Sequence, residues 1–266
     1  MIPVLNPASP AARGLIHAWP MFARGGWVCR DLSGQGESGF IHGVRSSAIP
    51  RPGPLRDGIF LGGGNERVTF GSQGFGAEFD INVDGNKQST IIAIAQLKNT
   101  GARAMLFGDY SSGGGSVSFF VEAEAAGTWR ATCGVPGATY SGGTVDKNPH
   151  CFVVTRYGYT KREAFFVDGV EIGSTTTSGL GQPGTQMALG AGLYTGSINW
   201  DGWVYDLRMY DRAMDDAEVD WHSRRENWFH AYERPQKRVW YVPPVVGGSF
   251  QAAWARNTNT MIQGAP

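Results

Sequence analysis

W-D-G-W-V-Y-D-L-R-M-Y-D-R-A-M-D-D-A-E-V-D-W-H-S-R-R-E-N-W, residues 200–228, holds a strand signal and the clearest helix signal of the chain. Its apolar and aromatic run at 202–210 predicts a core strand. Asp215 is a favourable N-cap, and Glu218 follows at the spacing of a capping box. Acidic residues come first and arginines last, which suits the helix dipole. We therefore expect a strand, a short turn and one helix near 215–228.

Upstream of this stretch, the chain consists of short apolar runs separated by turn residues. Residues 89–96, S-T-I-I-A-I-A-Q, are β-branched and nearly continuously apolar. They predict a strand covered on both faces, with a buried helix as the alternative. Asp168-Gly169 lies between two apolar runs and predicts a two-residue hairpin turn. About a dozen such runs with turns every 8–12 residues indicate an all-β sandwich or barrel, without a helix before residue 214.

Composition supports an all-β fold and argues against several functions. Glycine accounts for 39 of the 266 residues, about twice its average usage, which suits many tight turns. The formal net charge is zero, with 23 basic and 23 acidic residues, so no global charge favours nucleic acid or anionic membranes. No apolar run is long enough to span a membrane. The three cysteines, without a C-x-x-C motif, favour reduced thiols.

The two ends differ from the middle. Residues 1–13 contain three prolines and predict an extended arm. Residues 37–58, also proline-rich, predict a loop. Residues 243–266 lack periodicity but are too apolar for a solvating tail, so we expect a second arm that docks on another subunit. The expected domain spans residues 14–242, and residues 238–242 add one more strand to it. We find no secretion signal and expect synthesis in a host cytoplasm.

Five segments in order resemble the laminin-G-like or concanavalin A-like jelly-roll domain: residues 14–19, 31–36, 58–70, 165–172 and 201–219. The family pattern after the last strand is, loosely, R-A-L-S-x-x-E-I, where this chain has Met214 and Asp215 in place of Leu and Ser. The resemblance covers about residues 12–230. It implies a jelly-roll β-sandwich with one short C-terminal helix and extended terminal arms. This fold hosts lectins, hydrolases and structural modules, so it does not fix the function.

A narrower resemblance concerns the ends of the domain. The opening N-P-A-S-P-A-A-R-G-L-I-H-A-W-P at 6–20 and R-R-E-N-W-F at 224–229 are similar to versions found in proteins of tailed bacteriophages and prophages. Those versions usually have proline where this chain has Asn227. The resemblance implies a virion component, and both capsid decoration proteins and tail or fibre modules use such domains. Its partners would be the major capsid protein or other virion subunits, with a homo-oligomer expected.

Catalytic and metal sites are weakly indicated. Glycoside hydrolases on this fold carry the pattern E-x-D-x-x-E, and the nearest match is Glu122-Ala-Glu124, whose carboxylates would share one strand face without the third acid. We assign no catalytic residue, no cofactor and no metal ligand, and expect no enzyme activity. Calcium is the one metal with a candidate loop, through Asp80, Asp84 and Asn86, and an ordinary turn explains that loop as well.

Carbohydrate binding would use aromatic side chains beside loops as stacking platforms. Six aromatics lie at or near predicted loops, Tyr157 and Tyr159 among them, and the glycan-contacting candidates are Trp129, Tyr140, Tyr194 and Trp200. From the narrower resemblance, the main hypothesis is a non-enzymatic virion structural protein, specifically a capsid decoration protein that stabilises the head. The alternative is a carbohydrate-binding module of a tail fibre, receptor-binding or cell-surface protein. The sequence does not separate capsid from tail.

Overall fold

The computed structural model describes residues 4–21, 28–34, 38–42, 50–64, 66–70, 88–109, 119–133, 138–157, 162–176, 187–190 and 198–233. The chain divides into two units, Met1–Pro235 and Gln236–Pro266, and the fold described here is that of the first unit. The predicted strand at 238–242 and the predicted arm at 243–266 lie outside the described residues.

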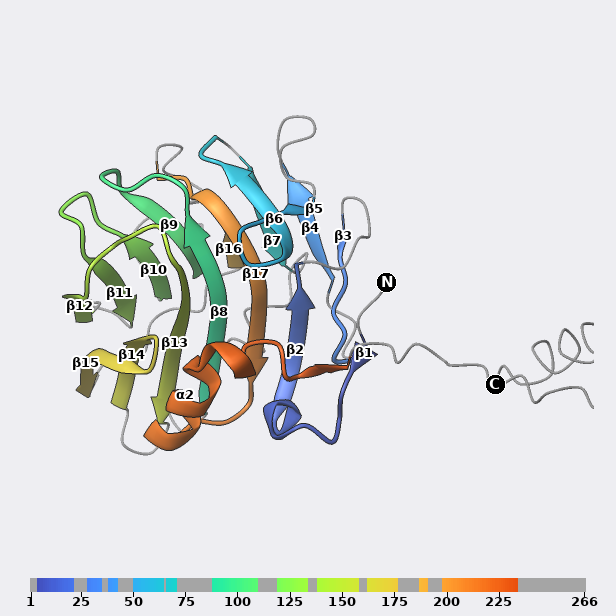
Figure 1. Cartoon of the computed structure of the whole chain (residues 1–266). Coiled ribbons are helices and arrows are strands. Elements are labelled where there is room, and N and C mark those ends of the chain that lie inside the picture. Colours follow the sequence, from blue (N-terminus) through green and yellow to red (C-terminus); the bar gives the residue numbers. More distant parts are fainter. Residues whose placement is uncertain are drawn as a thin grey trace, which may run out of the picture. The chain divides into compact units, whose positions relative to one another are not determined.

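Two antiparallel sheets pack face to face and confirm the predicted all-β sandwich (Figure 1). We call the first sheet I. In spatial order its strands are β15 (Val170–Thr176), β14 (Arg162–Val167), β13 (Pro149–Tyr157), β8 (Ser89–Leu97), β17 (Asp201–Tyr210), β6 (Asp57–Gly62) and β5 (Pro50–Pro52), with β2 (Leu15–Pro20) paired to β17.

Sheet II is the second layer. In spatial order its strands are β12 (Ala138–Gly142), β11 (Trp129–Cys133), β10 (Phe119–Ala123), β9 (Ala104–Asp109), β16 (Met187–Leu189), β7 (Arg67–Phe70), β4 (Gly39–His42) and β3 (Val28–Cys29). A separate ribbon pairs β1 (Val4–Leu5) with β18 (Tyr232–Glu233).

Strand β17, the predicted core strand, has neighbours along its whole length. It pairs with β8 on one side, while β6 and then β2 pair with successive halves of its other side. A bulge between Val204 and Asp206 lies where the partner changes. Strand β17 therefore joins β2 to the centre of sheet I.

The main core lies between the two sheets. It contains large aromatic side chains from both layers, among them Trp19, Phe70 and Phe152. Strand β8 contributes Ile91, Ala93 and Ala95 to this core, while Ile92 and Ile94 belong to a second cluster on the outer face of sheet I. Both faces of β8 are thus covered, as its continuous apolar run predicted.

The predicted helix is real but shorter than expected. Helix α2 covers Asp216–Ser223, and the capping box is present, with the backbone N–H of Glu218 donating to Asp215 Oδ1 at 2.8 Å. Arg224 is extended, with φ −67° and ψ 130°, and this ends the helix. A separate 3₁₀ turn, η2 (Arg225–Asn227), then leads to Trp228. The expectation of one helix over 215–228 was therefore wrong in its second half.

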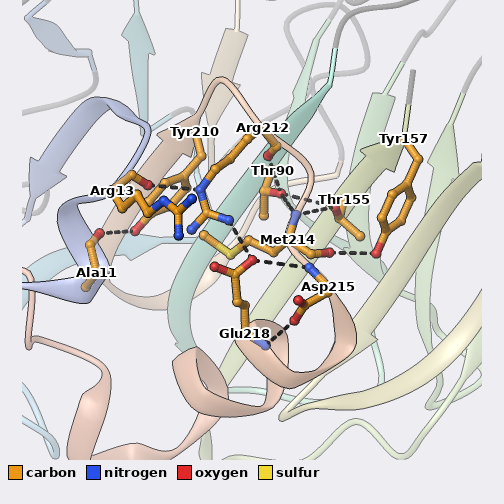
Figure 2. A network of polar contacts seen from close by, with 10 residues as sticks. All are labelled: Ala11, Arg13, Thr90, Thr155, Tyr157, Tyr210, Arg212, Met214, Asp215 and Glu218. Carbon is orange, nitrogen blue, oxygen red and sulfur yellow. Dashed lines mark hydrogen bonds and ion pairs between the residues drawn. The ribbon is translucent and has the colours of Figure 1, made fainter. Parts of the chain in front are cut away.

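A buried hydrogen-bond network fixes the corner between β17 and α2 (Figure 2). Thr90 Oγ1 donates to the carbonyl of Arg212 at 2.9 Å and accepts from the N–H of Met214 at 3.0 Å. Thr155 Oγ1 lies 3.2 Å from the same N–H, and the Tyr157 hydroxyl donates to the Met214 carbonyl at 2.6 Å. Sheet I therefore satisfies the backbone of the turn that positions α2.

The N-terminal segment is not a free arm, contrary to the prediction. After β1, the 3₁₀ turn η1 (Pro10–Ala12) is capped by Ser9, and Ala11 is fully buried. The Tyr210 hydroxyl donates to the Ala11 carbonyl at 2.9 Å, and Arg212 Nε donates to the Arg13 carbonyl at 3.1 Å (Figure 2). Prolines prevent long regular structure here, but side chains of β17 and its corner bind the backbone instead.

Two further local predictions have opposite outcomes. Asp168 and Gly169 have φ values of 51° and 83°, so the predicted two-residue turn between β14 and β15 is confirmed. The predicted loop at 37–58 instead contains β4 and β5. Both strands are short, and β5 contains two prolines on the outermost position of sheet I, where missing donors are tolerated.

Candidate functional site

The outer face of sheet I is covered. Ile92, Cys151 and Phe166 of the sheet pack in one cluster. Val219 of α2 and Trp228, the residue that follows η2, belong to the same cluster. Figure 1 shows α2 lying against the sheet that contains β8 and β13. This face is therefore part of the folded core.

The outer face of sheet II has a different character. Three residues of β10 and β11 point into the core: Val121, Ala123 and Ala131. Glu122 and Arg130 alternate with them along the two strands and lie opposite each other in the strand pair. Among the described residues no helix lies on this face. It is therefore the face of the sandwich on which we look for a binding site.

A charged cluster occupies the β9–β11 end of this face. Glu122 is fully buried, and Arg103 Nε donates to its Oε2 at 2.8 Å. Arg130 Nη1 lies 3.3 Å from Glu122 Oε1 and 3.4 Å from Glu124 Oε1. The side chains of Arg103 and Arg130 remain 44% and 27% exposed. A buried carboxylate thus holds two guanidinium groups that solvent still reaches.

Glu124 is held as an anion in this cluster. Thr128 Oγ1 donates to its Oε2 at 2.8 Å. This hydrogen bond lowers the pKa of Glu124, and further hydrogen bonds from Ser141 and Arg130 and the charge of Arg130 act in the same direction. Together they outweigh the effect of slight burial, which raises the pKa. Glu122 and Glu124 therefore share one face, as predicted, but Glu124 is a charged hydrogen-bond acceptor rather than a protonated acid.

The β4–β7 end of the same face carries an exposed aromatic side chain. Phe40 is 51% exposed, whereas its neighbour Ile41 points into the core. Beside it, His42 Nε2 lies 2.6 Å from Thr69 Oγ1. Burial and the charge of Arg67 lower the pKa of His42, so its imidazole is neutral at pH 7. Sequence reasoning missed Phe40 because it falls in the segment interpreted as loop; the alternation G-F-I-H was the available signal.

Together these groups can bind a polar ligand with a flat apolar face. Guanidinium and carboxylate groups form directional hydrogen bonds to hydroxyl groups, and an exposed ring provides a stacking surface. Glu122 on β10 and Phe40 on β4 are separated by β9, β16 and β7, which places the two ends about 19 Å apart across the sheet. A ligand that contacts both ends must therefore be longer than one sugar ring.

Two of the predicted glycan-contacting aromatics lie elsewhere. Trp129 and Trp200 are each 1% exposed, belong to the main core and stack with ring centroids 6.4 Å apart. The structure contradicts the exposure that their predicted role required, because both rings fill the space between the sheets. Tyr140 is partly buried and packs against the same core. Tyr194 lies outside the described residues.

A polar cluster near the N-terminus has a structural role. Asp31 accepts hydrogen bonds from the backbone N–H groups of Ala18 and Ser33, both at 2.9 Å, and its Oδ2 lies 2.8 Å from His17 Nδ1. Burial opposes ionisation of Asp31, but these hydrogen bonds outweigh it and lower its pKa. The D-L-S-G segment therefore fixes a turn to β2 and is not a candidate site.

Neither a metal site nor a membrane-spanning helix is found among the described residues. The loop with Asp80, Asp84 and Asn86 lies outside the described residues, and the residues that are described contain no group of three or more His, Cys, Asp and Glu arranged to hold a metal ion. Within the same ranges, no helix is long and apolar enough to cross a membrane. Cys29 and Cys151 are free, and burial raises the pKa of each thiol to about 12.

Comparisons with known proteins agree with this architecture. A family model described as the concanavalin A-like lectin/glucanases superfamily matches residues 63–220, more than half of the chain. A search of curated proteins finds no match.

Solved structures with a similar fold include a Trypanosoma rangeli sialidase in complex with 2,3-difluorosialic acid. It has a TM-score of 0.60 and 14% identity, over 81% of this chain and 35% of the sialidase. A botulinum neurotoxin type C structure, from a study of cell entry through two ganglioside molecules, has a TM-score of 0.57 and 10% identity, over 78% of this chain and 50% of that one. The binding domain of botulinum neurotoxin DC with rat synaptotagmin II has the same values. The chain thus spans a third to a half of these structures, and the likeness shows the fold.

Proposed function

The chain belongs to the concanavalin A-like lectin/glucanases superfamily, and from this premise we propose that it is a non-enzymatic carbohydrate-binding module that uses the outer face of sheet II. The observation that carries the proposal is the Glu122 cluster. A fully buried carboxylate fixes Arg103 and Arg130 on the face that carries no described helix. Preorganised, partly exposed guanidinium groups suit recognition of a hydroxylated ligand, because little entropy is lost on binding.

The similar structures support a glycan as the ligand class. The sialidase holds 2,3-difluorosialic acid, and the neurotoxin of type C interacts with two ganglioside molecules. At 14% and 10% identity this support is an analogy of fold, so the site must be argued from this chain's own side chains. Phe40 supplies an exposed ring on the proposed face, and Glu124 supplies a charged acceptor.

We infer the lack of catalysis from the state of the two carboxylates. A glycoside hydrolase needs one protonated acid with a raised pKa beside an ionised partner. Here hydrogen bonds lower the pKa of Glu124, and Glu122 is held by two arginines. Neither carboxylate suits the role of general acid. A panel of aryl glycosides should show no hydrolysis above that of a Glu122→Gln variant.

The experiment for binding is a glycan array followed by titration of the best ligand. Arg103→Gln and Phe40→Ala should each weaken binding about fivefold or more. The first variant loses one charged hydrogen bond to the ligand, and the second loses one stacking contact. Matched controls lie on sheet I. Arg162→Gln breaks a similar exposed ion pair with Glu171 at 2.8 Å, and Val170→Ala truncates a side chain that is 65% exposed.

Both controls should bind like the unchanged protein. Binding that is lost equally in the sheet I and sheet II variants would place the site elsewhere. An array without any bound glycan would refute carbohydrate recognition.

A second candidate function, which we propose as the alternative, is a bacteriophage virion structural protein, specifically a capsid decoration protein. It is favoured by the resemblance of residues 6–20 and 224–229 to phage and prophage versions. Pairing of β1 with β18 brings these two segments together at one place on the domain. The module would then display its sheet II face from a particle. The partners would be the major capsid protein or other virion subunits.

Deletion of residues 243–266 tests this role. We expect the shortened chain to fold, because these residues belong to the second unit, but to be incorporated poorly into particles. Occupancy is measured on purified particles by mass spectrometry. Unchanged occupancy would refute the docking role of this segment.

A further inference from the structure

A pocket of about 270 Å³ lies beside α2, on the helix-covered side of the sandwich and therefore apart from the face of sheet II. One wall is Pro10 of η1. The others come from the helix and its cap: Asp215, Ala217, Glu218, Trp221 and His222. These helical positions recur at three- and four-residue steps and so form one helix face.

The pocket has spare acceptor oxygens. Asp215 Oδ1 accepts from the Glu218 N–H, and Glu218 Oε2 accepts from Arg212 Nη1 at 2.6 Å (Figure 2). Among the described residues, none donates a hydrogen bond to Asp215 Oδ2 or Glu218 Oε1. Arg212 thus pairs with Glu218, one of the two carboxylates that line the pocket. The N-terminal helix dipole opposes a cation, but these carboxylates and that of Asp216 offset it.

His222 adds a buried acceptor to the same lining. It is 2% exposed, and its Nδ1 is buried without a hydrogen-bond partner among the described residues. Burial, together with the charges of Arg208 and Arg212, lowers the pKa of His222 to about 3, so the ring is neutral. A neutral imidazole keeps one nitrogen as an acceptor. The ring therefore brings no positive charge that would compete with a cation in the pocket.

An aromatic ring completes the pocket. Trp221 is half-buried and is held by edge contacts with His222, at 5.0 Å, and His230, at 5.6 Å between ring centroids. Tryptophan faces attract cations, and Pro10 and Ala217 provide apolar surface for an alkyl chain.

We propose that this pocket binds a primary organic ammonium ion, either a free alkylamine or a lysine side chain. An ammonium group has three donors and no acceptor, which matches the spare oxygens of Asp215 and Glu218, and the neutral ring of His222 in the same lining adds no competing positive charge. Its alkyl chain contacts Trp221 and Pro10.

Titration with n-butylammonium chloride, followed by NMR of the Trp221 indole and the Ala217 amide, tests the proposal. We expect saturation with a Kd of about 1 mM, within the limit for so small a ligand. Asp215→Asn removes the charge but keeps a residue that caps helices equally well, and should weaken binding about fivefold. Asp216→Asn removes the same charge outside the lining and should weaken it less than about twofold.

Two further ligands make the result decisive. n-Butanol has the same chain without the charge, and binding as tight as that of n-butylammonium would overturn the proposal. So would equal affinity in the protein and in Asp215→Asn, or no shift with any amine. Nα-acetyl-lysine methylamide distinguishes the sources. Tighter binding of this derivative supports a lysine of a protein partner, and tighter binding of n-butylammonium supports a free amine.

Discussion

His150 Nδ1 lies 2.6 Å from Asp168 Oδ2, and its Nε2 lies 2.9 Å from Asp146 Oδ1. Burial alone lowers the pKa of His150, but the hydrogen bonds and charges of the two aspartates outweigh it and raise the pKa above the ordinary value. Such a group contributes stability that is complete below its unfolded pKa of about 6.5 and is lost as pH rises through the folded value. We expect the free energy of unfolding to fall across that interval.

Urea denaturation from about pH 6 to about pH 9 measures this slope, and His150→Gln should flatten it. His230→Gln is the matched control, because His230 is exposed and its Nδ1 contacts only the hydroxyl of Ser9 at 3.1 Å among the hydrogen bonds described. A slope that persists in His150→Gln and disappears in His230→Gln would show that another group is responsible.

Thr90 and Thr155 provide a comparison within one network (Figure 2). Thr90→Val removes both an acceptor for the Met214 N–H and the donor to the Arg212 carbonyl, so we expect a loss of about 1–3 kcal/mol in unfolding free energy. Thr155→Val has the same shape change but leaves Thr90 to bind Met214, and should cost less. Chemical denaturation of both variants checks the order, and the reverse order would refute this account of the corner.

Gly202 of β17 pairs with Leu97 and lies close to the backbone of β8. A Cβ added there would clash with the carbonyl oxygen of Gln96, which is backbone and cannot move aside. Gly202→Ala should therefore cost about 3 kcal/mol or more. Gly62 is paired opposite Asp201, and its added Cβ would meet nothing closer than 3.6 Å, so Gly62→Ala should cost less than about 1 kcal/mol. Thermal denaturation separates the two, and equal losses would contradict the contact.

Local sequence signals predicted the parts of the fold that depend on local physics. The β-branched run of β8, the Asp168-Gly169 turn and the Asp215–Glu218 capping box all have the predicted structure. Each depends on residues within a few positions of one another, so spacing alone contains the information.

The candidate site depends on strand pairing between distant segments, and the sequence signals were weaker there. Phe40 is in a four-residue strand that is ordered by pairing with β7. Trp129 and Trp200 were expected to contact a ligand beside loops, but both rings lie in the core between the sheets. The face of the sheet on which a residue lies, and not its distance from a turn, decides whether its ring is buried. Glu122 and Glu124 were correctly placed on one face, yet Arg103, which pairs with Glu122, comes from the residue just before β9.

The ion pair between Asp206 and Arg208 provides the strongest test of the helix-covered side. Arg208 Nε lies 2.9 Å from Asp206 Oδ2, and both side chains are fully buried. Arg208→Met leaves a buried carboxylate whose pKa burial already raises to about 6, and should cost about 3–5 kcal/mol. The double variant Asp206→Leu/Arg208→Met removes both charges and should be more stable than Arg208→Met alone, although Tyr232 loses its acceptor. Tyr232→Phe controls for that hydroxyl. Additive losses in the double variant would show that the two charges do not stabilise each other.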